Sequence, residues 1–388
     1  MARTVFRGGV VFDGTGADPA RVDVAVADGR IVEVGRDLVG DDVVDIVGRG
    51  LLPGFIDCHA HVSMDELRST DEEAVRSASR NAFAAIANLR ATLDAGVTTV
   101  RDAAGADAGY REAIAAGDVP GPRLLVSLIQ LSPSAGPYDS RTPSGLDTWV
   151  PYAGIPRPTA DGPEALRAKV RELVQFGADV VKIFATGPWS MGRRGAERSM
   201  FRDEELAAIV DEAHRQGIRV MAHAHGSAGV IAAARAGADS IEHGFLADAD
   251  AIEAIAEAGA VLVPTLLASD GMAPEVVERH HDAVRRAHRR GVRIAMGTDC
   301  PMQPHGQNLR ELELLVACGL TPAEALRSGT GRAAELLGLG DEIGRIAPGL
   351  VADIVVVDGD PLDVHGLTNR IRDVYRDGRR VGPSGLTH

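Results

Sequence analysis

Cysteine is scarce in this chain, and long hydrophobic runs are missing. Only three cysteines occur among the 388 residues, Cys58, Cys300 and Cys318, so a disulfide framework is excluded and the reducing cytoplasm is the expected location. No apolar run approaches the length of a membrane span. The N-terminal MARTVF also lacks the apolar core of a signal peptide. We expect Cys58 and Cys300 to pack in the core, as cysteines often do.

Nucleotide-binding motifs and an excess of basic charge are also missing. No G-x-G-x-x-G follows the first predicted strand and there is no P-loop, so a nucleotide-binding fold has no motif in its favour. The formal net charge of −14 argues against nucleic acid or an anionic membrane as the main partner. We therefore expect a small-molecule substrate, with homo-oligomerisation left open. The hydrophobic content of 45% is typical of soluble globular proteins.

Both ends of the chain contain short, valine-rich strand patterns. They occur between residues 9 and 34, and again at residues 352–358 and 373–378. Asp28 and Gly29 are typical of a hairpin turn between two such strands. We predict that residues 1–53 and 344–388 together form one small β-sandwich domain.

The middle of the chain alternates between strand and helix patterns. Eight strands are predicted in series, at residues 55–62, 97–100, 122–131, 179–184, 218–223, 240–243, 260–267 and 292–297. Helices are predicted at residues 71–95, 163–176, 203–216, 227–236, 249–258 and 274–290. Such alternation predicts an α/β fold with a parallel sheet, and residues 54–343 fit a (β/α)8 TIM barrel. A doubly wound open sheet is the alternative.

One segment interrupts this alternation. Residues 133–161 contain six prolines and show no clear period. The segment also holds Tyr138, Trp149 and Tyr152, half of the six tryptophans and tyrosines in the chain. A disordered segment would be poor in such residues. We therefore predict an ordered lid or pocket wall.

The first barrel strand carries the two histidines of an H-x-H pattern. Alternate side chains of a strand point to the same face, so His59 and His61 face the same way and can share one metal ion. Two ligands do not complete a coordination sphere, and ordinary histidines on a half-buried strand are the alternative. Further ligands must come from later strands.

Lys182 lies in an apolar strand, where an unpaired charge would be costly. It can be an outward lysine that pairs with a carboxylate or extends to solvent. It can also have reacted with carbon dioxide, because the resulting carbamate is an anion whose two oxygens can bridge two metal ions.

Four more candidates follow later predicted strands. His223, His243 and Asp299 end their strands, and His225 lies two positions after His223. Singly, the histidines can be core residues and Asp299 a helix N-cap. Together with His59, His61 and Lys182 they gather at the C-terminal ends of strands, which is the face where barrel enzymes form active sites.

These motifs resemble those of the amidohydrolase superfamily of metal-dependent hydrolases. The branch that the chain resembles contains imidazolonepropionase-like proteins and prolidase-type dipeptidases. The motifs are LPGFIDCHAH at 52–61, VKI at 181–183, HAHG at 223–226, IEHG at 241–244, GTD at 297–299 and IAPGLVAD at 346–353. They span nearly the whole chain in the family's order.

The resemblance implies a binuclear metal centre. His59, His61 and Asp299 would hold the first metal, and His223 and His243 the second, with Lys182 as the bridging carbamate. The roles of His223 and His225 can be exchanged, and His225 otherwise lies beside the substrate. Imidazole and carboxylate ligands suit Zn²⁺, although Mn²⁺, Co²⁺ and Fe²⁺ are also accepted.

The implied reaction is hydrolysis of an amide or peptide-like C–N bond by a metal-bridging hydroxide, with Asp299 as the proton shuttle. The turn at residues 131–137 lacks the histidine usual in the dipeptidases, which argues against a simple dipeptide substrate and makes a bulkier amide at least an equal alternative. Candidate substrate contacts are Tyr138, Trp149, Tyr152, Arg193 and His305. The last of these can instead cap a helix.

Three other functions are weighed against amide hydrolysis. An esterase, lactonase or organophosphate hydrolase would use the same metals. A deaminase of the superfamily would lack the bridging lysine and carry a glutamate at the position of Gly226. A non-catalytic scaffold would have lost ligands, whereas all six candidates are present.

Overall fold

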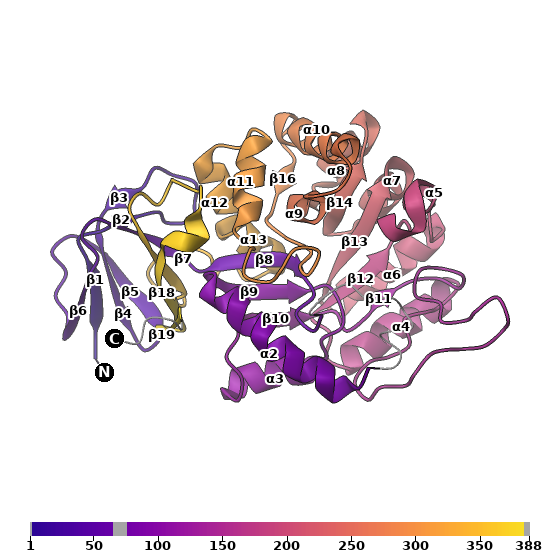
Figure 1. Ribbon diagram of the computed structural model, residues 1–388, viewed down its shortest axis with the longest axis horizontal. Coiled ribbons are helices and arrows are strands. Elements are labelled where there is room, and N and C mark those ends of the chain that lie inside the picture. The colour runs from indigo at the N-terminus through magenta and orange to yellow at the C-terminus, as the bar shows by residue number, and fades with distance from the viewer. Residues whose placement is uncertain (1, 65–75, 384–388) are drawn as a thin grey trace.

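Strands from the two ends of the chain lie together at one side of the molecule (Figure 1). The computed structural model describes residues 2–64 and 76–383. A four-stranded sheet has the order β5 (Arg30–Gly35), β4 (Asp23–Ala27), β1 (Thr4–Arg7), β6 (Asp42–Asp45). A six-stranded sheet has the order β19 (Arg379–Gly382), β18 (Ile371–Arg376), β17 (Ile354–Asp358), β7 (Arg49–Pro53), β2 (Val10–Val11), β3 (Ala20–Arg21).

The pairing of β17 with β7 joins the C-terminal strands to the N-terminal ones. Side chains of both sheets share one buried cluster, which includes Phe6, Val24, Leu51 and Val356. The predicted hairpin at Asp28-Gly29 is confirmed, since both residues have positive φ between β4 and β5, as a two-residue hairpin turn requires.

The middle of the chain forms two sheets in which every pairing is parallel. The first has the order β10 (Arg123–Val126), β9 (Val97–Asp102), β8 (Phe55–Ala60). The second runs in chain order through β11 (Gln130–Leu131), β12 (Val180–Phe184), β13 (Arg219–Gly226), β14 (Ser240–Leu246), β15 (Val261–Val263) and β16 (Arg293–Ile294).

Backbone hydrogen bonds join the outer strands of these two sheets. The Cys58 amide donates to the Met296 carbonyl at 2.9 Å, and the Thr298 amide donates to the His59 carbonyl at 3.0 Å. The segment after β16 therefore runs beside β8 and brings Asp299 to the histidines of that strand. The two sheets also meet on the other side of the first sheet. There the Asp179 amide, directly before β12, donates to the Val126 carbonyl of β10 at 2.8 Å.

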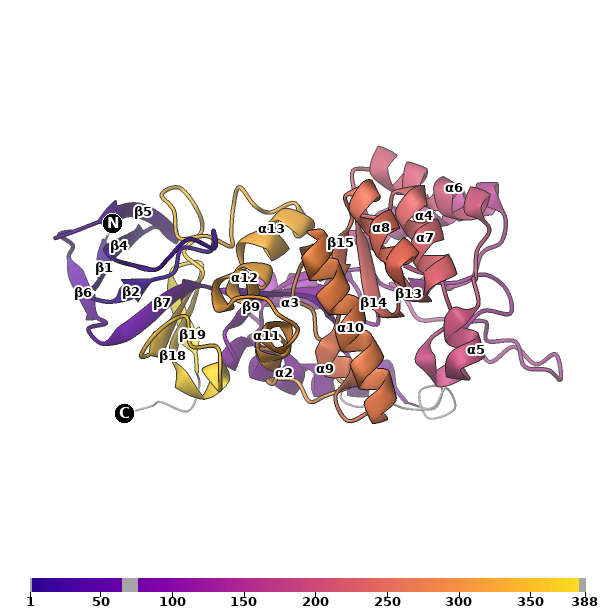
Figure 2. The same ribbon diagram turned by 90° about the horizontal axis from the view of Figure 1, so that it is seen from above.

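Helices surround the parallel strands in both views (Figures 1 and 2). They are α2 (Ala78–Asp94), α3 (Ala108–Ala116), α4 (Pro163–Gln175), α5 (Gly192–Glu197), α6 (Asp203–Arg215), α7 (Ser227–Ala236), α8 (Ala249–Ala258), α9 (Leu266–Ser269), α10 (Pro274–Arg290), α11 (Arg310–Ala317), α12 (Pro322–Ser328) and α13 (Gly331–Leu337). Two short 3₁₀ helices are η1 (Trp189–Met191) and η2 (Leu367–Arg370).

Local signals explain where several of these helices begin and end. In α8 the Asp248 side chain accepts a hydrogen bond from the Ala251 amide, and Gly259 ends the helix in a left-handed conformation, as N-cap and C-cap residues do. In α4, Leu166, Val170 and Leu173 are all buried, which is the spacing of one helix face. The predicted helix at residues 249–258 is confirmed with the same bounds by α8.

Several sequence-based boundaries were wrong. The single strand predicted at 122–131 is two strands, because Leu128 has a φ of 68° and β11 pairs with β12 rather than with β9. Helix α3 was not predicted. Helix α2 begins after Ser77, and residues 71–75 of the predicted helix 71–95 lie outside the described residues.

The proline-rich segment 133–161 contains isolated bridges but no helix or laddered strand. In Figures 1 and 2 the segment between β11 and α4 extends away from the surrounding helices. Internal contacts hold it: Arg141 pairs with Asp139 at 2.8 Å, and Arg157 pairs with Asp147 at 2.8 Å.

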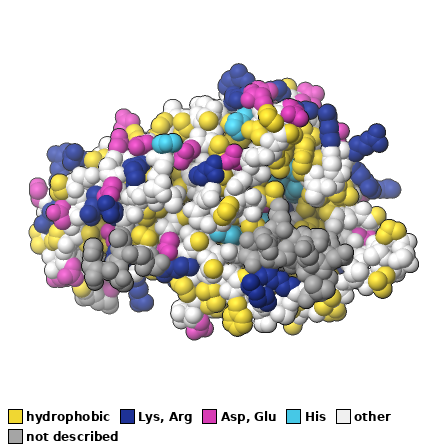
Figure 3. Space-filling model, viewed as in Figure 1, with side chains coloured by type: hydrophobic (Ala, Val, Ile, Leu, Met, Phe, Trp, Pro, Cys, Tyr) yellow, Lys and Arg dark blue, Asp and Glu magenta, His cyan; other side chains and the backbone are white. Residues whose placement is uncertain are grey.

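All three cysteines are buried and unpaired, as expected for core packing. Within residues 2–64 and 76–383, no helix combines the length and apolar character needed to cross a bilayer. On the face shown in Figure 3, Lys and Arg side chains are interspersed with Asp and Glu.

Candidate metal centre

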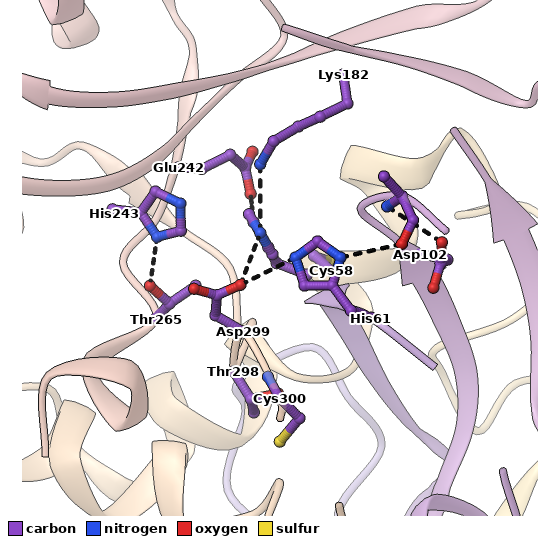
Figure 4. Close-up of polar contacts among 12 residues, drawn as sticks. Cys58, His61, Asp102, Lys182, Glu242, His243, Thr265, Thr298, Asp299 and Cys300 are labelled. Atoms are coloured by element: carbon purple, nitrogen blue, oxygen red, sulfur yellow. Dashed lines mark hydrogen bonds and ion pairs between the residues drawn. The ribbon is translucent and has the colours of Figure 1, made fainter. Parts of the chain in front are cut away.

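His59 of β8 and His61, directly after that strand, point their Nε2 atoms at one carboxylate oxygen. Asp299 Oδ1 lies 3.3 Å from His59 Nε2 and 3.2 Å from His61 Nε2. His59, His243 and Asp299 each offer a ligand atom, and these atoms lie within 4.8 Å of one another. In Figure 4, His61, His243, Lys182 and Asp299 point toward one another from separate strands and loops.

Hydrogen bonds at the other ring nitrogen orient both imidazoles. His59 Nδ1 lies 2.6 Å from the Glu242 carboxylate, and His61 Nδ1 lies 3.1 Å from the Ala104 carbonyl oxygen. Because both partners are acceptors, each Nδ1 carries the proton. The Nε2 lone pair of each neutral ring then faces the Asp299 oxygen.

Lone pairs that face a carboxylate oxygen repel unless a proton or a cation lies between them. Two imidazole nitrogens and a carboxylate are a suitable donor set for a divalent metal such as zinc. Positive charge is favoured at this position: burial would raise the pKa of Asp299, but the charge of a protonated His59 and the hydrogen bonds of His59 and His61 lower it well below its ordinary value. The residues present therefore fit a metal ion.

Lys182 is buried in β12, with only 1% of its surface exposed. Its Nζ lies 3.3 Å from His59 Nε2. Burial lowers the pKa of this amine from 10.5 to about 8, although Glu242 and Asp299 act in the opposite direction. The outward lysine considered as an alternative is therefore wrong, since Lys182 points into the candidate site.

The remaining histidines form a cluster of rings beside these groups. The ring centroids of His223 and His243 are 4.6 Å apart, those of His225 and His243 are 5.1 Å apart, and those of His59 and His243 are 4.8 Å apart. His223 Nε2 lies 3.3 Å from the Gly187 carbonyl oxygen. His225 Nδ1 is buried and has no hydrogen-bond partner among the described residues. Both rings thus lie beside His243.

A buried ion pair between Arg101 and Glu242 holds His59 at Nδ1, the ring nitrogen that does not face Asp299. Arg101 Nη2 donates to both Glu242 oxygens at 3.0 and 3.2 Å, and the Ser240 hydroxyl also donates to Glu242. Arg101 is 1% and Glu242 0% exposed. Burial would raise the pKa of Glu242, but the Arg101 charge and the His59 hydrogen bond lower it to about 2. The carboxylate therefore stays ionised and fixes the proton on His59 Nδ1.

Replacing Glu242 with glutamine should weaken metal binding by about 10- to 100-fold, as changes to groups behind metal ligands commonly do. The amide would offer only one acceptor oxygen where Arg101 and His59 both donate. Metal titration against a competing chelator would measure the affinity. Ser240→Ala is the matched control, because it removes only one of the bonds to Glu242, and it should change affinity less.

Other supporting groups were not found from the sequence. Asp57 accepts hydrogen bonds from the Thr298 hydroxyl at 2.6 Å and from Asn308 Nδ2 at 2.8 Å. It thereby ties β8 to the turn that carries Asp299, which has a φ of 56°. Asp57 lies at i−2 from His59, on the same face of the strand, which is the signal that could have revealed it.

His243 is held in a similar way. Its Nδ1 lies 2.8 Å from the Thr265 hydroxyl, and its carbonyl oxygen lies 3.1 Å from His280 Nε2. The predicted helix 274–290 is confirmed by α10, and His280 on this helix is fully buried. Glu311 accepts hydrogen bonds from the Leu266 and Leu267 amides and so fixes the chain beside Thr265.

The five candidate substrate contacts lie in different places. Tyr138 has its ring centroid 5.5 Å from that of Phe184, whose ring is 4.3 Å from His223. The Tyr152 hydroxyl donates to Asp107 at 3.0 Å. Trp149 is partly exposed in the same extended segment.

The two basic candidates have other partners. Arg193 is exposed on α5 and pairs with Glu197 at 2.9 Å. His305 Nε2 lies 3.1 Å from the Met64 carbonyl oxygen, and its Nδ1 lies 3.4 Å from the Thr92 hydroxyl. His305 therefore packs between α2 and the segment after β8.

Two aromatic residues that sequence reasoning missed lie beside His225. Its ring centroid is 4.5 Å from that of Phe245 and 6.0 Å from that of Trp189. Trp189 begins η1, directly after the strand that carries Lys182. With Phe184 and Tyr138 these rings form an aromatic wall next to the histidine cluster.

Comparison with known proteins agrees with this geometry. The model of the amidohydrolase family matches residues 51–381. The chain is 34% identical over 343 residues to ochratoxinase from Aspergillus niger, covering 81% of this chain and 71% of that protein. It is 32% identical to imidazolonepropionase from Acidiphilium cryptum, covering 88% of each chain.

Solved structures agree as well. A prolidase in complex with N-methylphosphonate-L-proline has a TM-score of 0.88 and 33% identity, with 98% of this chain and 99% of that chain covered. Ochratoxinase from A. niger has a TM-score of 0.88 and 29% identity, with coverage of 100% and 97%. The chain therefore belongs to the amidohydrolase family and is a hydrolase that acts on carbon–nitrogen bonds.

Proposed function

We propose that the protein is a binuclear metal-dependent hydrolase that cleaves an amide or peptide-like C–N bond of a small molecule. One observation carries the proposal: Asp299 Oδ1 faces the Nε2 atoms of His59 and His61 at 3.2–3.3 Å, while the Lys182 amine approaches the same side of His59. These four groups, each with a lone pair or a negative charge, converge there, which two cations would stabilise.

His59, His61 and Asp299 would hold one metal ion, and His243 with His223 would hold the other. His225 is the exchange partner of His223, and its free Nδ1 supports this alternative. Single His223→Ala and His225→Ala variants would separate the two roles, since only loss of a ligand lowers the metal content.

Lys182 would bridge the two ions as a carbamate. Only the neutral amine reacts with carbon dioxide, and a pKa of about 8 leaves part of Lys182 neutral near physiological pH. The carbamate converts a buried cation into an anion with two oxygens. That change suits a position beside four histidines far better than an ammonium does, because the ammonium would compete with metal ions.

Metal ions bound here would polarise the substrate carbonyl and lower the pKa of water toward about 7. Asp299 is the residue of the cluster suited to proton transfer. Its side chain is 19% exposed, whereas His59 is 1% exposed, so its carboxylate is accessible to a substrate. We assign Asp299 to take a proton and deliver it to the leaving nitrogen, with His225 beside the substrate.

The substrate is proposed to be an amide with an apolar or aromatic part. The similar proteins include an ochratoxinase and a prolidase, and the aromatic wall of Tyr138, Phe184, Trp189 and Phe245 lies beside the histidines. Among the earlier candidates Tyr138 stays in the proposal. Trp149, Tyr152, Arg193 and His305 would act only through movement of the segments that carry them.

We further propose that the two parallel sheets form one (β/α)8 barrel, residues 54–343, and that residues 1–53 and 344–388 form a β-sandwich domain. Support comes from the hydrogen bonds between β8 and the segment after β16, and from the cluster shared by the two terminal sheets. Residues 1, 65–75 and 384–388 of this division lie outside the described residues.

Removing metal tests the proposal. Protein prepared without chelator should carry about two divalent ions per chain, by analogy with paired metal sites, and should hydrolyse some members of a panel of N-acyl amino acids and dipeptides. Chelation should abolish this activity, and added Zn²⁺ or Mn²⁺ should restore it. Full activity in metal-free protein would contradict the proposal, and turnover of lactones or aryl esters alone would replace it with the esterase function.

A further inference from the structure

Arg332 is a half-buried guanidinium without a counter-ion. It lies in the first turn of α13, on the opposite side of the strands from the histidine cluster. Its Nε is buried and unbonded, and among the described residues no hydrogen bond or ion pair to its side chain is formed. An arginine cannot lose its proton in a protein, so the buried Nε–H of Arg332 is a charged donor without a partner, which an anion would satisfy.

The nearby charges do not supply that anion. Burial lowers the pKa of Arg332, and Arg327 and Arg293 lower it further, whereas Glu335 and Glu324 act in the opposite direction without pairing with it. Glu324 is occupied by the Thr321 amide at 2.8 Å and the Thr321 hydroxyl at 2.9 Å. Glu335 pairs with Arg327 at 3.6 Å. The Nε of Arg327 is buried and unbonded as well.

Both arginines line a cavity of about 140 Å³. Its other polar side chains are His288, Glu324 and Thr15. The cavity lies where the loop between β2 and β3 meets α10, α12 and β16. A cavity of about 150 Å³ accommodates benzene, so an inorganic phosphate or a small carboxylate fits, whereas a nucleotide does not.

We propose that this cavity binds a small oxyanion, of the size of phosphate, between the guanidinium groups of Arg332 and Arg327. Guanidinium groups bind phosphate and carboxylate oxygens with paired hydrogen bonds. The Nε–H groups of Arg332 and Arg327 are donors without a hydrogen-bond partner among the described residues. Thr15 and Gly16 of the loop between β2 and β3 line the cavity as well, and a Cβ at Gly16 would lie 3.2 Å from Arg327 Cδ. The anion would therefore link the N-terminal loop to α12 and α13.

This site is separate from the metal centre, so its test does not depend on hydrolysis. The metal-loaded, full-length protein is titrated with inorganic phosphate, with succinate as a second arm, against potassium chloride of equal ionic strength. Thermal unfolding should show a saturable rise in Tm of about 3–6 °C at concentrations near 100 times Kd. A phosphate response without a succinate response identifies phosphate as the ligand class, and the reverse identifies carboxylates.

Three variants assign the effect to the cavity. Arg332→Gln should abolish the rise, and in chloride alone it should melt no lower than the native protein, because it removes an unpaired charge. Arg332→Lys keeps the charge with fewer donors and should weaken binding about tenfold, the equivalent of one lost hydrogen bond to a charged group. Arg36 is an exposed arginine directly after β5. Arg36→Gln is the control and should leave the rise in Tm unchanged.

Two results would overturn the proposal. One is a Tm that follows ionic strength alone, with no saturation by phosphate or succinate. The other is an equal rise in the native protein and in Arg332→Gln, because the anion would then bind elsewhere, for example at the metal centre.

Discussion

Replacement of Lys182 by alanine is expected to remove the bound metal and to lower turnover by about 10³-fold or more, because metal ions contribute several kcal/mol of transition-state stabilisation and about 1.4 kcal/mol is tenfold in rate. Lys182 lies between two hydrogen-bonded neighbours, β11 and β13. The variant should therefore keep its fold. Metal content by elemental analysis and hydrolysis of the best amide substrate are the two measurements.

A carbamate at Lys182 leads to a further prediction that an unmodified lysine would not. Short carboxylic acids, such as acetate or formate, should restore part of both metal content and turnover in Lys182→Ala, because a carboxylate has the same pair of oxygens. The control is Lys169→Ala, the only other lysine of the chain, which lies on α4 and pairs with Glu172. Full metal content and activity in Lys182→Ala would rule out a bridging role.

The candidate ligands were predictable because strand geometry is local. A strand places His59 and His61 on one face whatever surrounds it, and parallel strands gather their C-terminal ends at one edge. Each of the candidates follows or lies within a strand pattern that the sequence displays. Residue spacing in the sequence therefore predicts side-chain positions best where the rule involves only residues that are neighbours along the chain.

The groups behind the ligands were not predictable in the same way. Arg101 and Glu242 are 141 positions apart, and they meet only because the parallel sheets bring β9 and β14 to the same interior. His280 lies on a helix rich in basic residues, yet it is buried. Its spacing of three and seven from the buried Ala283 and Ala287 was the signal for a buried face.

The number of aromatic residues in a segment was a poor guide to which residues form the aromatic wall. Tyr138, Trp149 and Tyr152 share one segment, yet Tyr152 bonds outward to Asp107 and only Tyr138 approaches the histidines by way of Phe184. Trp189 lies in a short 3₁₀ turn that no periodic pattern marks. Side-chain direction in irregular segments depends on tertiary contacts, which residue type alone does not encode.

Asp299 carries the second large effect. Its φ of 56° lies in the left-handed region, which asparagine tolerates as well as aspartate does. Its backbone amide donates to the His59 carbonyl at 2.7 Å, a bond that a side-chain change leaves intact. Asp299→Asn therefore keeps the turn and one ligand oxygen, and it removes mainly the ability to accept a proton.

Turnover of Asp299→Asn should fall by about 10²- to 10⁴-fold, the range for loss of a general acid–base group, while most of the metal stays bound. Asp248→Asn is the matched control, because asparagine caps a helix as well as aspartate does, and it should leave turnover and metal content unchanged. Metal loss that parallels the loss of turnover would make Asp299 chiefly a ligand. Near-native turnover with full metal content would remove it as the base and leave His225, whose buried Nδ1 has no partner among the described residues, as the residue to examine for proton transfer.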